Sequence, residues 1–96
     1  MLTKVTTIIW DVSAKENLGA KLISDIQEKV RSFVKAGLTD GKLHLDYNNP
    51  AVIQRCWLNE AAAQEFATWM LELSSKNNKP IKEIKIEDID KLIVTN

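Results

Sequence analysis

Residues 51–58, with the sequence AVIQRCWL, have the β-branched and aromatic character of a β-strand. Successive side chains of a strand point to opposite faces, so Val52 and Cys56 share one face. Ile53 and Trp57 share the other face. A strand on a half-solvated sheet is apolar on one face only. This stretch therefore predicts a central strand in a sheet that is covered on both sides.

The rest of the chain predicts three more strands and two helices. Residues 4–12, KVTTIIWDV, also place apolar side chains on both faces, whereas the strands at 42–47 and 81–89 each have one apolar face. Asn59 is a favourable N-cap for the second helix. In chain order the predicted elements are a strand at 4–12, a helix that follows Ser13 and ends before Gly37, strands at 42–47 and 51–58, a helix at about 60–76, and a strand at 81–89.

The first helix carries the clearest amphipathic pattern in the chain. Ser13 and Glu16 have the spacing of a capping box, in which each side chain satisfies the backbone N–H of the other residue. Gly37 is placed to cap the C-terminus. The apolar residues recur at intervals of three and four and fall within about 160° of the helix circumference. They are Leu18, Leu22, Ile23, Ile26, Val30, Phe33 and Val34.

The order β-α-β-β-α-β is that of a ferredoxin-like α+β fold, with two helices on one face of a four-stranded antiparallel sheet. Right-handed crossovers place the first and third strands in the centre of the sheet and the other two at its edges. The face without helices then exposes about half a dozen apolar side chains, and we expect Trp10 and Trp57 among them. A second copy of the chain would cover that face, so the sequence predicts a homodimer packed sheet against sheet, with the tail at 90–96 extending an edge or crossing to the partner.

Composition limits the classes of partner. The 96 residues predict one domain spanning 1–96, with thirteen basic and thirteen acidic residues. Zero net charge removes the usual electrostatic reason to expect nucleic acid or an anionic membrane as a partner. No apolar run approaches the length of a membrane span. The single cysteine, Cys56, predicts no internal disulfide and suits a reducing cytoplasm.

The segment 56–66, CWLNEAAAQEF, ends a strand with an aromatic residue and continues through a polar cap into an alanine-rich helix. With the order of elements, it resembles the dimeric α+β-barrel group of ferredoxin-like proteins, which includes small antibiotic-biosynthesis-type monooxygenases. The resemblance covers nearly the whole chain and is mostly topological. It implies cofactor-free oxygenase chemistry on a small apolar or aromatic molecule. Many of those proteins carry a histidine on the helix that follows, whereas FATWMLEL (66–73) has none.

Four residues form the predicted ligand site: Trp10, His44, Arg55 and Trp57. His44 and Arg55 are also the candidate catalytic residues. His44 is the only histidine and is either a general base near pH 7 or a solvated histidine at the rim of an interface. Arg55 lies on an apolar face and needs either a carboxylate, such as that of Asp11 or Asp46, or a bound anion.

Other chemistries lack their motifs. One histidine and one cysteine fall short of a zinc site, so no metal is predicted. Cys56 has no activating base beside it and is interpreted as a small core residue. The segment 51–58 lacks the glycine–aromatic pattern of an RNA-recognition domain. DVSAKENLGA (11–20) has neither the arginine-bearing loop of an acylphosphatase nor the Cys-x-x-Cys of a metallochaperone, and no glycine-rich phosphate loop occurs.

Two functions stay open at this point. The first is a small dimeric protein that acts as a non-enzymatic interaction or accessory module, because no complete catalytic constellation is present. The second is a cofactor-free monooxygenase-type enzyme with a pocket near the four site residues. A closed, dry dimer interface would favour the first function, whereas an enclosed pocket of a few hundred Å³ reached by His44 or Arg55 would favour the second.

Overall fold

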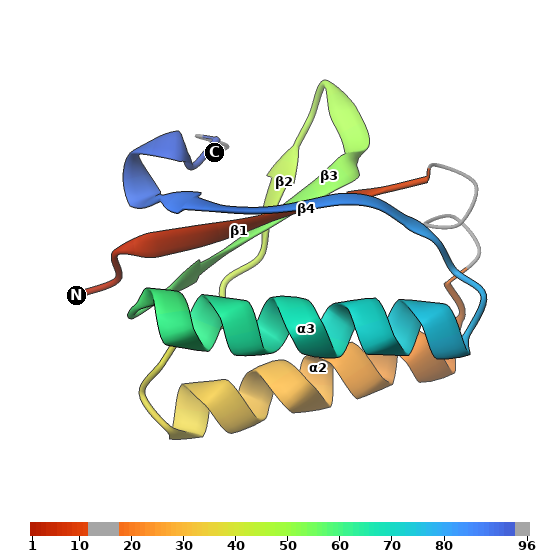
Figure 1. The fold of residues 1–96 in the computed structure, drawn as a ribbon, viewed down its shortest axis with the longest axis horizontal. Helices are drawn as coiled ribbons and strands as arrows, with labels where there is room; N and C mark the ends of the chain where they lie inside the picture. Colours follow the sequence, from red (N-terminus) through yellow and green to blue (C-terminus); the bar gives the residue numbers. More distant parts are fainter. Residues whose placement is uncertain (12–17, 94–96) are drawn as a thin grey trace.

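The computed structural model describes residues 1–11 and 18–93 (Figure 1). The predicted ferredoxin-like fold is confirmed: within these residues, two α-helices and four strands follow one another in the expected order, and a short 3₁₀ helix, η1, follows the last strand. The elements are β1 (Lys4–Trp10), α2 (Ala20–Lys35), β2 (His44–Asp46), β3 (Asn49–Trp57), α3 (Glu60–Lys76), β4 (Ile81–Asp88) and η1 (Ile89–Lys91).

The sheet has the strand order β2-β3-β1-β4, and neighbouring strands are antiparallel. The two strands that are apolar on both faces, β1 and β3, lie in the centre as the sequence predicts. Both helices cover the same face of the sheet, and η1 lies on the opposite side (Figure 1). We call these the helix face and the second face. No described helix has the length and apolar character needed to cross a membrane.

The core lies between the helix face and the two helices, and Trp57 is at its centre. Its ring is fully buried and makes an edge contact with Phe33, whose centroid is 5.0 Å away. The ring centroid of Phe66 lies 4.7 Å from that of Trp57 and 6.2 Å from that of Phe33, so the three rings form one cluster. The indole Nε1–H donates a 2.9 Å hydrogen bond to Oγ1 of Thr6. Asn59 caps α3, as predicted, by accepting a hydrogen bond from the Ala62 backbone N–H at 2.9 Å.

The expectation that Trp10 and Trp57 lie on the second face is wrong. Both are buried in the core beneath the helices. Each central strand is apolar on both faces, so alternation separates the faces without showing which one meets the helices. The larger rings occupy the side where two layers meet, because burial of apolar area there is greatest.

The second face is occupied by the chain's own tail. Val5 and Cys56 on this face are buried, and η1 lies over it (Figure 1). The side-chain amide of Gln54 donates to the Lys91 carbonyl oxygen at 3.2 Å and accepts from the Ile93 backbone N–H at 2.6 Å. The predicted extension of a sheet edge by the tail is therefore wrong for residues 90–93. Residues 89–91 form a 3₁₀ turn, and Lys91 and Ile93 bind Gln54 on this face instead. Residues 94–96 lie outside the described part of the chain.

An ion pair joins the first and last strands next to this tail. The Lys4 ammonium lies 2.6 Å from Oδ1 of Asp88, the residue that precedes η1. The hydrogen bond with Asp88 raises the pKa of Lys4, and the same bond lowers the pKa of Asp88. The pair lies at the end of β4, where the tail begins.

The first helix begins later than predicted. It starts at Ala20, after Gly19 with a φ of 83° in the region that favours glycine, so Leu18 and Gly19 are not helical. The predicted capping box at Ser13 and Glu16 lies outside the described residues. The predicted C-terminal cap is confirmed, since Gly37 has a φ of 75° and follows the last turn.

Candidate ligand-binding cavity

A cavity of about 290 Å³ lies on the helix face, between α2, the sheet and the segment that leads into β2. Its described lining is apolar except for Gln27 and Arg55. The floor consists of side chains that are nearly inaccessible to solvent, namely Ile8, Trp10, Phe66 and Met70. Leu18, Ile26 and Ile53 are partly buried in its walls. Ile23, Leu43 and Leu45 are 45%, 49% and 39% exposed and form its mouth.

The cavity arises because one edge of the α2 stripe extends beyond the core. Leu22, Val30 and Phe33 are buried, whereas Ile23 and Val34 on the same stripe are largely exposed. These apolar side chains lie toward β2, a strand of only three residues at the edge of the sheet. A strand this short leaves the space beneath it incompletely filled.

We call residues 43–46, which comprise β2 and the residue before it, the edge segment. Strand pairing places the apolar side chains of this segment on the helix face. Leu45 is paired directly with Ile53, and side chains directly opposite each other in an antiparallel pair point to the same face. Leu43 lines the same cavity. Apolar side chains of α2 and of the edge segment therefore face a shared opening, and the amphipathic pattern of each alone does not reveal this.

Arg55 is the cationic residue of the cavity wall. It is half-buried, and burial lowers the pKa of its guanidinium while the negative charge of Asp40 raises it. It also lines a neighbouring cavity of about 400 Å³ together with Arg31 and Asp40. The guanidinium stays charged, because its ordinary pKa is far above neutral pH.

One of the two predictions for Arg55 is an ion pair with a carboxylate, and residues 1–11 and 18–93 contain no such pair. No carboxylate oxygen there lies within 4.0 Å of the guanidinium nitrogens. The Asp46 carboxylate instead accepts a hydrogen bond from the Asn48 backbone N–H at 2.8 Å. The other possibility, an anion supplied by a ligand, stays open.

The four predicted site residues do not form one site. Trp10 and Arg55 line the cavity together. Trp57 is buried deeper in the core and does not line it. His44 is paired opposite Gln54, which faces the tail, so its side chain lies on the second face. The sheet therefore separates His44 from Arg55, and the two candidate catalytic side chains lie on opposite faces.

The sequence alone does not identify most of the lining. The mouth residue Ile23 belongs to the apolar stripe of the first helix, and Leu43 and Leu45 belong to the apolar face of the strand predicted at 42–47. A signal was present in the width of the α2 stripe, since about 160° is more than a single packed face requires. The position of the opening, however, depends on the pairing of Leu45 with Ile53, which alternation alone does not fix.

The turn before the mouth depends on Gly41. Its φ is 75°, and a Cβ at this position would lie 2.9 Å from Cγ2 of Val34 on α2. We expect Gly41→Ala to lower the free energy of unfolding by about 2 kcal/mol, because strain of the left-handed conformation and a steric clash add together. Urea denaturation measures the change.

Gly37→Ala is the matched control for this prediction. Gly37 has the same φ of 75°, but a Cβ there meets nothing within 4 Å. Its substitution should therefore cost only the conformational strain, about 1 kcal/mol. If both variants lose the same free energy of unfolding, a Cβ at position 41 does not clash with Val34. Adding Val34→Ala to Gly41→Ala should recover the difference between them.

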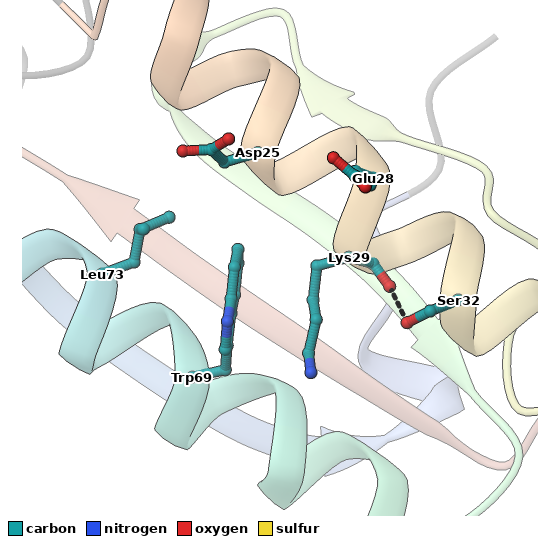
Figure 2. A pocket seen from close by; sticks show the side chains of 6 residues that line it. All are labelled: Asp25, Glu28, Lys29, Ser32, Trp69 and Leu73. Atoms are coloured by element: carbon teal, nitrogen blue, oxygen red, sulfur yellow. Dashed lines mark hydrogen bonds between the residues drawn. The ribbon is translucent and has the colours of Figure 1, made fainter.

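A second, open depression of about 380 Å³ lies on the outer surface between the helices. Figure 2 shows Trp69 of α3 beside the extended side chain of Lys29 of α2. The Lys29 ammonium lies 5.8 Å from the Trp69 ring centroid and 5.5 Å from that of Phe33. This cation–π contact links the two helices. The cation that suits these rings is thus already supplied by the chain.

Metal and thiol chemistry find no support in the described residues. They contain no group of three His, Cys, Asp or Glu side chains placed to hold a metal ion. Cys56 is buried, and burial raises the pKa of its thiol, with a further contribution from the charge of Asp40. A raised pKa keeps the thiol protonated and poorly nucleophilic, which suits a packing role.

Comparison with protein-family models, curated proteins and solved structures gave no match to this chain. The strand order and the two helices establish the ferredoxin-like architecture independently of any relative. The resemblance to small monooxygenases stays a prediction.

Proposed function

We propose that this protein is a non-enzymatic accessory module that binds a small apolar or amphipathic molecule in the cavity between α2 and the edge segment. The observation that carries the proposal is the cavity itself. Its floor is buried and apolar, and its mouth is formed by exposed apolar side chains. Exposed apolar groups around a concave site are typical of small-molecule recognition.

The size of the cavity limits the ligand. Its volume of 290 Å³ is at the lower end of ligand pockets and equals the liquid volume of about ten water molecules. A ligand of about ten non-hydrogen atoms therefore fits. Because each non-hydrogen atom of a small ligand contributes a limited binding free energy, we expect a ligand of this size to have a dissociation constant in the micromolar range.

The described lining favours binding over catalysis. It contains no carboxylate, imidazole or thiol that would accept a proton from a bound molecule. His44, the predicted general base, lies on the second face. The second candidate function, a cofactor-free monooxygenase-type enzyme, is favoured by the apolar pocket that Trp10 and Arg55 share. It would require the substrate to ionise without help from these lining groups.

Binding is tested with 1-octanol, a neutral probe of the expected size, by ¹H–¹⁵N NMR. We expect shifts of the backbone amides of Ile8 and Ile26 and of the Trp10 indole N–H. Ile23→Trp should weaken binding about tenfold or more, because the larger ring fills the mouth. An absence of saturable shifts in the wild type would refute the cavity as a binding site.

Leu71→Trp is the matched control. Leu71 is an exposed apolar residue on the other helix, 52% accessible, and lies outside the lining of the cavity. The substitution adds the same ring to a helix surface and should leave octanol binding unchanged. Equal weakening by both variants would show that the probe does not enter between α2 and the edge segment. Oxygen consumption upon addition of an aromatic substrate would instead favour the enzyme.

A further inference from the structure

Among the described lining residues of the apolar cavity, Arg55 is the one cationic group, and its donors are unused. The guanidinium has five N–H donors. Within the described residues its side chain makes no hydrogen bond shorter than 3.5 Å and no ion pair shorter than 4.0 Å. Its neighbours along the same face of β3 are Ile53 and Trp57, which offer no acceptor. A half-buried charge without an acceptor is a costly arrangement that a bound anion would relieve.

The position of Arg55 places this charge at one end of the cavity. It is shared by the apolar cavity and by the neighbouring, more polar one that contains Arg31 and Asp40. A ligand whose apolar part rests against Ile8 and Trp10 can thus direct a polar head group toward the boundary between the two cavities. A planar guanidinium binds a carboxylate through two parallel hydrogen bonds, which neutral head groups do not reproduce.

Asp40 limits how much negative charge the site accepts. It lines the neighbouring cavity together with Arg55, and its negative charge opposes the lowering of the guanidinium pKa by burial. A head group with two negative charges would be repelled by Asp40 more strongly than one with a single charge. The electrostatics of the boundary therefore favour a monoanion.

We infer that the cavity selects small amphipathic monoanions, with the apolar part lying in the cavity and a carboxylate paired with the Arg55 guanidinium. This inference rests on the proposed function and adds the chemical class of the ligand. The cavity volume suits a ligand of about ten non-hydrogen atoms, and the guanidinium suits a carboxylate. Together they predict a medium-chain or aromatic carboxylic acid in its ionised form.

The test compares octanoate, 1-octanol and octyl phosphate on the wild-type chain at neutral pH, by NMR titration at constant ionic strength. Octanoate should bind about 10- to 100-fold more tightly than octanol, the range expected for a hydrogen-bonded charged pair. Octyl phosphate should bind more weakly than octanoate. Arg55→Gln should remove the advantage of octanoate while octanol binding is retained, and Arg55→Lys should restore part of it.

Arg31→Gln is the matched control, because it removes the same charge from the neighbouring cavity but not from the ligand cavity. It should leave the preference for octanoate intact. Equal binding of octanoate and octanol by the wild type would overturn the inference while leaving the proposed function standing. A preference that survives Arg55→Gln in a folded variant would also overturn it. Failure of both probes to bind would overturn the proposed function as well.

Discussion

Replacing Trp57 with alanine is expected to lower the free energy of unfolding by about 3–5 kcal/mol. A domain of 96 residues has a total stability of roughly 5–14 kcal/mol, so this single change removes a large share of it. The reason is the position of the ring. It is fully buried against Phe33 of α2 and Phe66 of α3, and no neighbouring side chain can move in to fill the space without disturbing both helices.

Part of this loss comes from a hydrogen bond. The Trp57 indole N–H donates to Thr6 Oγ1, and the Thr6 side chain is fully buried. Trp57→Phe keeps most of the apolar area but removes the donor. We expect it to cost about 1–3 kcal/mol, less than alanine, because the ring packing partly remains. The buried Thr6 hydroxyl loses the indole donor and keeps only its 3.4 Å hydrogen bond to the Arg55 carbonyl oxygen.

Trp69→Ala is the control for ring size. Trp69 is only partly buried and contacts the core through Phe66, at a centroid distance of 6.2 Å. Its removal should cost clearly less than that of Trp57. Urea denaturation followed by circular dichroism measures all three variants. If Trp57→Ala is no more destabilising than Trp69→Ala, the placement of Trp57 at the centre of the core is wrong.

The same measurement separates two interpretations of Trp57. A residue of a sheet-to-sheet interface would change the stability in a way that depends on protein concentration. A core residue lowers the stability of the single chain at every concentration. We expect the second behaviour, since Trp57 packs under the helices.

The sequence predicts the order of elements and the centre of the sheet because both follow from patterns within single segments. The two-faced character of residues 4–12 and 51–58 indicates central strands, and these are β1 and β3. Which face meets the helices depends on packing between segments. The sequence therefore does not show that Trp10 and Trp57 lie under the helices, or that the sheet separates His44 from Arg55.

The sequence does not predict the cavity, because the cavity also depends on packing between segments. Trp10 and Arg55 were recognised as candidates because a ring and a charge stand out in a strand. The residues of the mouth are ordinary apolar residues, and only the pairing of Leu45 with Ile53 brings them to one opening. The tail has no periodic pattern at all. The signal for its docking was Gln54, a polar amide on an apolar face that requires a partner.

Replacing Gln54 with leucine is expected to release residues 89–93 from the second face. Gln54 is buried, and its amide makes three hydrogen bonds: to Thr7 Oγ1, to the Lys91 carbonyl and from the Ile93 N–H. Leucine has a similar size but satisfies none of them. We expect a loss of about 2–4 kcal/mol in stability, and loss of hydrogen-exchange protection at the Ile93 amide.

Thr7→Val is the matched control for this prediction. It removes the hydroxyl that accepts from Gln54 Nε2 at 2.9 Å but leaves both hydrogen bonds to the tail. The Ile93 amide should therefore remain protected, although stability falls by about 1 kcal/mol. Loss of protection in both variants would show that the tail is not held by Gln54 alone.

Release of the tail also bears on the predicted homodimer, because a sheet-to-sheet dimer and the docked tail compete for the same surface. Gln54→Leu should uncover the apolar side chains near Val5 and Cys56 and increase self-association at tens of micromolar, as measured by sedimentation velocity. The wild type should associate less under the same conditions. If it is already dimeric while the Ile93 amide stays protected, the dimer must form through a surface other than the one the tail occupies.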